Sequence, residues 1–290
     1  DDLARASPAE IETAKASLSL VPLIRKGMIA WSKKSGLTLE EYNEKVAERE
    51  PSECKHCNGT GIWLPPKPRE VGVVHPSSAA GCRLRLYLDV VGTYAPVSTF
   101  KPELMVVFGI GHALHDVIQG ILRDEVGKGL VKYHDEAPIR IYGANGLCVS
   151  GHADADYATT LAGGVHEIKT INDEEFQGLK APKREHTLQA ETLYSTALDR
   201  PFTTYTYISK TWPFPLKEYV VPYRVELWDR WVKKKAKPVE DALGSGDLPM
   251  ADGTESDCRG CVYTGDCPQS LVKSKTPFRA APKKKVGRGL

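Results

Sequence analysis

The pattern of hydrophobic and polar positions changes near residue 100 of this 290-residue chain. From there apolar residues recur at three- and four-residue spacing, which predicts a helix with one face against a core. They are Val107, Ile110, Leu114, Val117, Ile118 and Ile121. Short segments at 137–143, 147–157 and 163–170 then predict three strands, before a helix over 184–198 and a strand over 202–210. This order of helix, three strands, helix and strand predicts an α/β fold.

The first fifty residues instead favour helices. Ser7–Glu10 and Thr38–Glu41 both have the Ser/Thr-x-x-Glu form of a capping box, and the helices are expected to end at Pro51. Residues 58–76 are rich in glycine and proline, which is typical of a linker or an ordered loop. The chain is therefore predicted to have three parts: a helical N-terminal extension over 1–70, a main domain over 71–270 and a tail over 271–290.

Composition is that of an ordinary globular protein of one or two domains, with 41% hydrophobic and 26% charged residues. The most apolar run, residues 103–122, contains Glu103, His112, His115 and Asp116, which argues against a membrane span. No stretch has the form of a signal peptide, so a cytoplasmic protein is expected.

The formal charge of +2 hides an asymmetry between the tail and the rest of the chain. Residues 271–290 carry seven of the 39 Lys and Arg and no acid, which leaves 32 bases against 37 acids elsewhere. Such a tail is either a solvated terminus or an arm that neutralises nucleic-acid phosphates by counterion release.

Three of the seven cysteines lie close together near the C-terminus. Cys258, Cys261 and Cys267 have the spacing C-x2-C-x5-C, which presents three thiolates to one metal centre and needs a fourth ligand from elsewhere. The candidates for that ligand are Cys82, the pair Cys54 and Cys57, and Cys148. Cys82 is favoured because it precedes a predicted helix, whereas Cys148 lies in a predicted strand and is most simply a buried apolar residue.

Cys54 and Cys57 form a second motif, C-x2-C-x-G-x-G, which resembles half of a zinc-binding repeat. Two interpretations stay open. Either these are two thiols in a loop, or they bind zinc that is completed by His75 or by another protomer.

An acid and a lysine share one face of the strand predicted over 163–170. Residues i and i+2 of a strand project to the same side, so Glu167 and Lys169 point together. The same rule pairs Asp154 with Asp156 on the preceding strand, and adjacent strands bring these acids beside Glu167. An isolated E-x-K is usually a surface ion pair, but clustered carboxylates suit Mg²⁺ or Mn²⁺ and, with a lysine, metal-assisted phosphodiester hydrolysis.

These motifs occur together in one order along residues 75–270. They are Gly111-x-x-x-His115, Gly151-x-x-Asp154, Glu167-Ile168-Lys169-Thr170, and Gln189 with Tyr194. Together they resemble the RecB-type branch of the PD-(D/E)xK nuclease superfamily. With "CRLRLYL" upstream and "CRGCVYTGDC" downstream, the sequence is similar to the iron–sulfur members, such as CRISPR-associated adaptation nucleases, phage recombination exonucleases and nuclease domains of DNA end-resection enzymes.

The resemblance implies a restriction-endonuclease-like fold, with a central mixed sheet flanked by helices. It implies His115, Asp154, Glu167 and the backbone carbonyl of Ile168 as metal ligands, Lys169 as the catalytic lysine and Gln189 as an orienting residue. It also implies a 4Fe-4S cluster with a structural role as a clasp, on Cys82, Cys258, Cys261 and Cys267. His115 is preferred to His112 as a ligand because it follows Gly111 by four positions.

The implied function is a divalent-metal-dependent DNA exonuclease in recombination, repair or CRISPR adaptation, with DNA and a recombination or adaptation protein as partners. The alternative is a DNA-binding scaffold or subunit that keeps the fold and the iron–sulfur clasp without catalysis. A zinc hydrolase built on His112 and His115 lacks the acid spacing of known helical zinc sites. One departure is that Tyr194 follows Gln189 by five positions, where the family has four, so only Gln189 is assigned a role.

Overall fold

The computed structural model describes residues 19–35, 72–91, 102–189, 193–211, 213–259, 261, 263–264 and 267–272. The predicted capping boxes, the Cys54–Cys57 motif and all but two residues of the basic tail lie outside these ranges.

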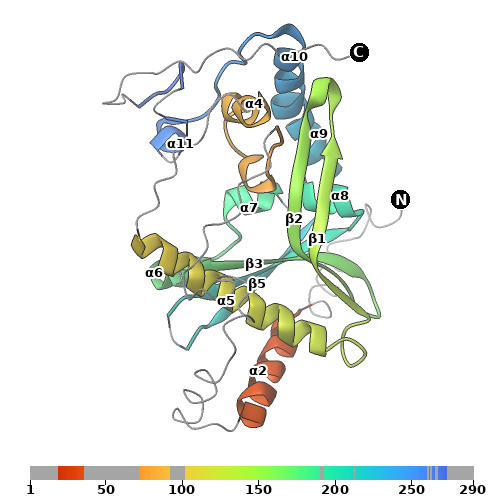
Figure 1. Ribbon diagram of the computed structural model, residues 1–290. Helices are drawn as coiled ribbons and strands as arrows, with labels where there is room; N and C mark the ends of the chain where they lie inside the picture. The colour runs from red at the N-terminus through yellow and green to blue at the C-terminus, as the bar shows by residue number, and fades with distance from the viewer. Residues whose placement is uncertain are drawn as a thin grey trace, which may run out of the picture.

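A five-stranded mixed sheet, ordered β1-β2-β3-β4-β5, forms the centre of the molecule (Figure 1). Its strands are β1 Lys132–Tyr142, β2 Cys148–Ala158, β3 Gly163–Ile171, β4 Phe202–Ser209 and β5 Leu216–Pro222. Only β3 and β4 pair in parallel. A parallel pair needs a crossover, and this one contains the short helices α6 Asp173–Gly178, α7 Arg184–Gln189 and α8 Ser195–Leu198.

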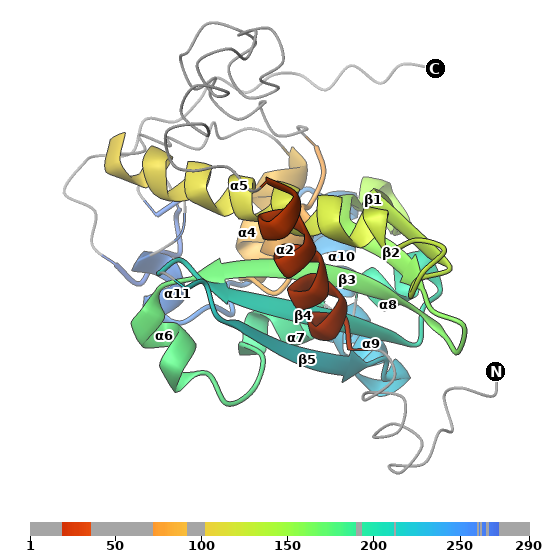
Figure 2. The same ribbon diagram turned by 90° about the horizontal axis from the view of Figure 1, so that it is seen from below.

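Helices cover both faces of the β3–β5 part of the sheet. On one face lie α5 Pro102–Asp124 and α2 Val21–Ser35 (Figure 2). Ile24, Leu122 and Ile168 belong to the core cluster between them and the sheet. On the other face, Phe176 of α6 packs against Tyr205 and Tyr207 of β4. The predicted central mixed sheet flanked by helices is confirmed in this form.

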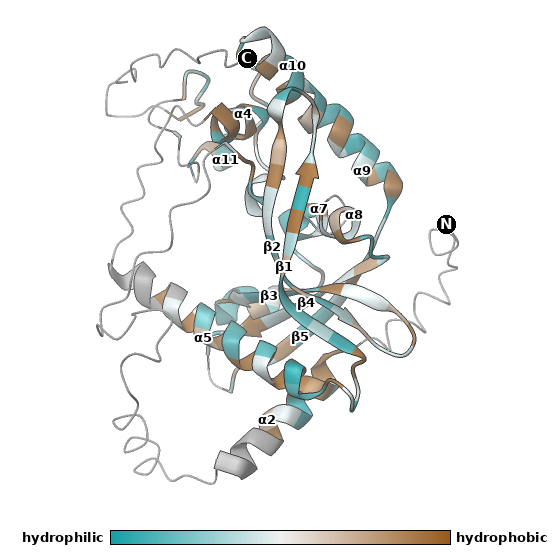
Figure 3. Cartoon of the chain, turned by 45° about the vertical axis from the view of Figure 1, so that its right-hand side comes forward, coloured by the Kyte–Doolittle hydropathy of each residue, from teal (hydrophilic) through white to brown (hydrophobic). Residues whose placement is uncertain are grey.

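The hairpin of β1 and β2 rises away from the other strands (Figure 1). Exposed and buried residues alternate along most of β1, as expected for a strand with one buried face, and hydrophilic and hydrophobic segments follow one another along the hairpin (Figure 3). A second helical layer packs around its upper end: α4 Arg83–Val91, α9 Val225–Trp231, the π-helix η6 Val232–Ala236 and α10 Lys237–Ser245. The 3-10 helices η3 Pro76–Ser78 and η4 Ala144–Gly146 and the helix α11 Glu255–Arg259 complete the described elements.

Helix α2 belongs to the core of the domain. Leu20 and Ile24 are fully buried with residues of α5 and the sheet. The Glu218 carboxylate of β5 accepts hydrogen bonds from the Leu20 and Val21 N–H groups, at 2.8 and 3.1 Å. A carboxylate there caps the first turn of the helix. Residues 19–24 therefore pack with the main domain although they lie in the segment predicted as an N-terminal extension.

The predicted helix near residue 100 is confirmed as α5, but the prediction that all its periodic apolar residues face the core is wrong. Ile118 and Ile121 are buried, whereas Val107, Ile110 and Val117 are 37%, 42% and 42% exposed. The apolar stripe is wider than the surface that the sheet and α2 cover, so its flank faces outward. Among the described residues, no helix combines the length and apolar character that a bilayer span requires.

The predicted strand and helix order is confirmed for residues 102–209, with differences in extent. β1 begins at Lys132, five residues before its predicted start. The predicted helix over 184–198 is divided between α7 and α8, and Leu193 and Tyr194 adopt a π-helical turn before α8. The strand β5 and the helices between 225 and 245 were not predicted.

Candidate active site

The site lies where β2 separates from β3. Their ladder covers only four pairs, from Ala158↔Gly163 to Ala155↔His166. Beyond it the Asp154 N–H donates to Glu167 Oε1 at 3.2 Å, and the Ile168 N–H donates to Asp154 Oδ2 at 2.6 Å. Buried backbone groups need partners, and here the two carboxylates take the place of the missing ladder bonds. The split in the sheet therefore fixes Asp154 and Glu167 beside each other.

The carbonyl of Ile168 faces the same split. In a strand the N–H and C=O of one residue point to the same edge, and the Ile168 N–H points to Asp154. The Ile168 side chain is fully buried on the opposite face of the sheet from Glu167, among the core residues under α2 and α5.

Two basic side chains complete the cluster. His115 of α5 places Nδ1 3.4 Å from Asp154 Oδ1, and the Lys169 ammonium forms an ion pair with Glu167 Oε2. The Glu167 side chain is 2% exposed, whereas those of His115 and Lys169 are 26% and 25% exposed. Solvent therefore reaches the cluster on the side of His115 and Lys169, whereas the side of Glu167 is shielded from it.

The pKa values of the two carboxyl groups are shifted in opposite directions. Burial raises the pKa of Glu167 to about 7, against the opposing pull of Lys169. For Asp154, burial also raises the pKa, but the hydrogen bond from His115 and the charge of Lys169 outweigh it and lower the pKa to about 2. The charges of Glu167 and Asp154 overcome burial at Lys169 and raise its pKa. Near neutral pH the cluster thus combines one firmly ionised acid, one acid able to exchange a proton, and one cation.

Gln189, the predicted orienting residue, is buried at the end of α7. Tyr194 is also buried, and its burial together with the nearby charge of Glu167 raises its pKa. A π-helical turn holds one residue more than an α-helical turn. Leu193 and Tyr194 lie in such a turn, and Tyr194 lies near Glu167 although it follows Gln189 by five positions.

Asp156 does not contribute to the cluster, contrary to the prediction that it joins Asp154 beside Glu167. Its carboxylate accepts from Arg200 Nε and NH2 at 2.6 and 2.9 Å, and from Lys132 Nζ at 2.6 Å. Asp156 does share a sheet face with Glu167, but it lies within the paired part of β2, opposite Val165. Its role is a bidentate ion pair that fastens the start of β4 to β2.

Gln119 was not predicted from the sequence as a residue of the site. Its side chain donates to the Asp154 carbonyl at 2.9 Å and so ties α5 to β2 at the site. The signal is its position four residues after His115, which places both on one side of a helix.

The donors at the split sheet fit a hard divalent cation in chemical type: two carboxylates, a backbone carbonyl and an imidazole. Their arrangement is not that of a formed metal centre. Within the described ranges, no group of three or more His, Cys, Asp or Glu side chains is placed to hold a metal ion. The carboxylate oxygens instead engage backbone N–H groups, His115 and Lys169.

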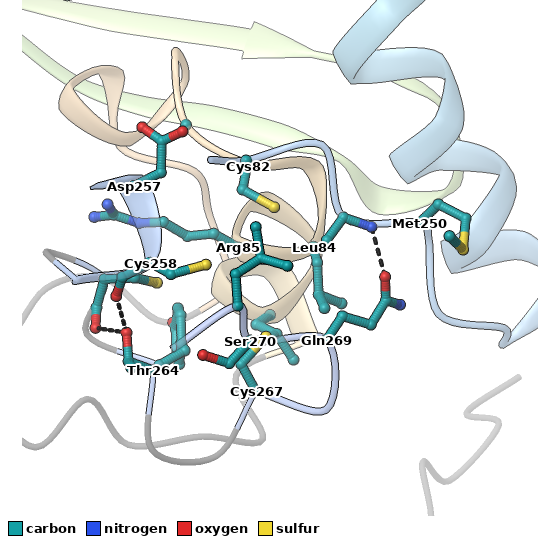
Figure 4. Close-up of a pocket in the computed structure, with 17 residues that line it drawn as sticks. Cys82, Leu84, Arg85, Met250, Asp257, Cys258, Thr264, Cys267, Gln269 and Ser270 are labelled. Carbon is teal, nitrogen blue, oxygen red and sulfur yellow. Dashed lines mark hydrogen bonds between the residues drawn. The ribbon is translucent and has the colours of Figure 1, made fainter. Parts of the chain in front are cut away.

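Cysteines from the two ends of the domain meet at one cavity of about 410 Å³ (Figure 4). Cys82, just before α4, lines it together with Cys258, Cys261 and Cys267. Burial raises the pKa of Cys261 and of Cys267, and the neighbouring thiols raise both further. The other described candidate, Cys148, lies in β2 and is not among the residues lining this cavity.

Polar contacts join the segments of the chain that surround this cavity. Asp252 accepts from the Arg83 N–H at 2.8 Å and pairs with Lys235 at 2.7 Å. Tyr263 donates to Asp89 of α4 at 2.6 Å. The C-terminal cysteine segment is therefore fastened to α4 by bonds that do not involve the thiols.

The chain matches no protein-family model and no curated protein. Solved structures with remote similarity include one described as SSO0001, at 17% identity over 71% of this chain and 90% of that one, with a TM-score of 0.46. Another is an alkaline exonuclease, LHK-Exo from Laribacter hongkongensis. It is 15% identical over 60% of this chain and 91% of that one, with a TM-score of 0.41. The same exonuclease in complex with dAMP is 14% identical over 60% of this chain and 91% of that one, with a TM-score of 0.40.

Proposed function

We propose that the chain is a divalent-metal-dependent DNA exonuclease with a restriction-endonuclease-like fold of the PD-(D/E)xK type. The observation that carries the proposal is the exchange of hydrogen bonds between Asp154 and the strand bearing Glu167 and Lys169, at the point where the sheet splits. This arrangement places one buried acid, one partly buried acid and a lysine at a single opening. A structural role would be served as well by an apolar pair, because buried ion pairs seldom add net stability.

In the proposed enzyme, Asp154, Glu167, the Ile168 carbonyl and His115 hold Mg²⁺ or Mn²⁺. When bound, the ion polarises the phosphoryl oxygen and lowers the pKa of a water molecule. Lys169 stays protonated and stabilises the negative charge that develops on the phosphorus oxygens. Gln119 holds Asp154 in place through the hydrogen bond to its backbone carbonyl, and the buried Tyr194 lies near Glu167.

We further propose that the four thiols around the cavity bind a 4Fe-4S cluster with a structural role. The support is that thiols from residues 82 and 258–267 line one cavity, and that thiolates are the ligands of such clusters. Zinc at Cys54 and Cys57, and a partner in recombination, repair or CRISPR adaptation, stay predictions from the sequence.

The proposal is tested with purified protein and DNA oligonucleotides labelled at the 5′ or the 3′ end, single- and double-stranded. We expect stepwise shortening from an end with Mg²⁺ or Mn²⁺ and none with EDTA. Binding to DNA without cleavage under every metal condition would instead favour the non-catalytic scaffold.

Gly111 provides a test of how α5 is positioned. A Cβ at this residue would lie 3.0 Å from Thr170 Oγ1 on β3. Gly111→Ala should push α5 away from β3, draw His115 from Asp154, and lower kcat/KM for DNA by about tenfold, since small displacements at a reacting centre are costly. Gly120→Ala in the same helix is the matched control, because its Cβ would meet only an arginine side-chain nitrogen at 3.9 Å. Equal activity in both variants would contradict this role for Gly111.

A further inference from the structure

His186 on α7 is held against β4, the strand next to the one that carries Glu167 and Lys169, by three contacts outside the predicted motifs. Its ring stacks on Tyr205, with centroids 5.6 Å apart and planes 16° from parallel. Its Nδ1 lies 2.6 Å from the Tyr207 hydroxyl, and its backbone carbonyl accepts from the Tyr205 hydroxyl at 2.8 Å. Both tyrosines are fully buried, so the imidazole has a fixed position and orientation.

This fixed position is next to the proposed catalytic pair. In the parallel register of β3 and β4, Glu167 lies opposite Tyr205 and Lys169 lies opposite Tyr207. Paired residues of neighbouring strands project from the same face. His186 therefore sits above the two tyrosines that flank Glu167 and Lys169, on the same face of the sheet. It also precedes Gln189 by three residues, so both lie on one side of α7.

The hydrogen-bond network assigns the proton on the imidazole. The Tyr207 oxygen accepts from the Lys183 N–H at 3.2 Å, and among the described residues its O–H has no acceptor other than His186 Nδ1, so we assign Nδ1 as the acceptor. Burial, Lys169 and Lys183 lower the pKa of His186 to about 3, which keeps the ring neutral. The remaining proton is then on Nε2. Within the part of the chain that the structure describes, Nε2 has no hydrogen-bond partner, and the residue is only partly buried.

We propose that His186 is a substrate-binding residue whose Nε2–H donates to a phosphate oxygen of the DNA strand, beside the phosphate that Lys169 faces. The inference rests on the proposed function, because it takes DNA as the ligand. Side-chain N–H groups are common phosphate donors. A neutral donor in a fixed orientation adds a directional contact where Lys169 already supplies positive charge. The stacking on Tyr205 and the hydrogen bond with Tyr207 remove the need to order the ring on binding.

The test compares three variants in a binding assay that does not depend on cleavage. A fluorescein-labelled single-stranded oligonucleotide is titrated in Ca²⁺, and the Kd is read by fluorescence anisotropy. Gln places an amide N–H near the position of Nε2, Asn places one near Nδ1, and Phe has none. His186→Gln should stay within about threefold of wild type. His186→Asn and His186→Phe should raise Kd by about tenfold or more, as expected for a lost hydrogen bond to a charged group.

A purely structural role predicts a different result. His186→Gln and His186→Asn would then share one Kd and differ from wild type only in melting temperature, which would overturn the inference. Equal slopes of log Kd against log salt in wild type and His186→Asn are also expected, because a neutral donor releases no counterion. A slope reduced by about one in the variant would contradict a neutral imidazole. If the wild type binds but does not cleave, the proposed function fails, while the Kd comparison still decides the role of His186.

Discussion

Replacing Lys169 with methionine should lower the rate of DNA cleavage by about a hundred- to a thousandfold, the range observed when one group that stabilises transition-state charge is removed. Methionine keeps the length of the side chain and removes the ammonium that pairs with Glu167. The fold should survive, because burial already raises the pKa of Glu167 to about 7 and the acid can take up a proton once its partner is lost.

Lys132→Met is the matched control for this substitution. Lys132 also pairs with a sheet aspartate, Asp156, at 2.6 Å, but outside the cluster. Single-turnover rates at saturating enzyme isolate the cleavage step from binding. A Lys169→Met protein that cleaves within about twofold of Lys132→Met would contradict the role given to Lys169.

Replacing Cys82 with serine should have the largest effect on stability. Cys82 and Cys258 are 176 residues apart in sequence, and both line the same cavity. By analogy with cross-links that close such long loops, the proposed cluster would contribute on the order of 5 kcal/mol by bridging them. For a domain of this size that corresponds to a decrease of about 10–20 °C in Tm.

The measurements are iron and acid-labile sulfide per chain in anaerobic preparations, together with thermal melting. Wild type should be brown with iron and sulfide in equal amounts, and Cys82→Ser should lose both. Cys148→Ser is the control, since Cys148 lies in β2 and does not line the cavity. A colourless wild-type protein that contains only zinc would refute the iron–sulfur cluster, and equal melting temperatures in both variants would refute the clasp.

Strand periodicity was sufficient to predict which residues share a face. Glu167 and Lys169 project together because side chains alternate along any strand, and the structure pairs them. Periodicity does not show where a ladder ends. Asp154 and Asp156 obey the same rule, yet only Asp154 lies at the split, while Asp156 is bound by Arg200, which is 44 residues away.

Elements with a weak periodic signal were not predicted from the sequence. β5 is an edge strand in which most residues, including Lys217 and Glu218, are only partly buried, so its pattern does not alternate clearly. The π-helix at 232–236 shifts the helical phase between α9 and α10 and so obscures a 3.6-residue repeat. The π-helical turn at Leu193 and Tyr194 shifts the helical phase in the same way.

The cysteine cavity was predicted in part. Spacing grouped Cys258, Cys261 and Cys267, and Cys82 was favoured as the fourth ligand over the pair Cys54 and Cys57 and over Cys148. The structure places Cys82 at the cavity because α4 packs against the C-terminal segment through Tyr263 and Asp89. Such long-range packing has no local signal in the sequence.

The central claim is that the carboxylates at the split between β2 and β3 form a phosphodiesterase site. The most direct measurement compares wild type with Asp154→Asn on one end-labelled oligonucleotide in Mg²⁺ and in Mn²⁺. Asparagine keeps an oxygen for the Ile168 N–H and removes the negative charge. The wild type should shorten the DNA, and the variant should have the same melting temperature and no detectable cleavage. Equal cleavage by the two proteins would contradict the claim.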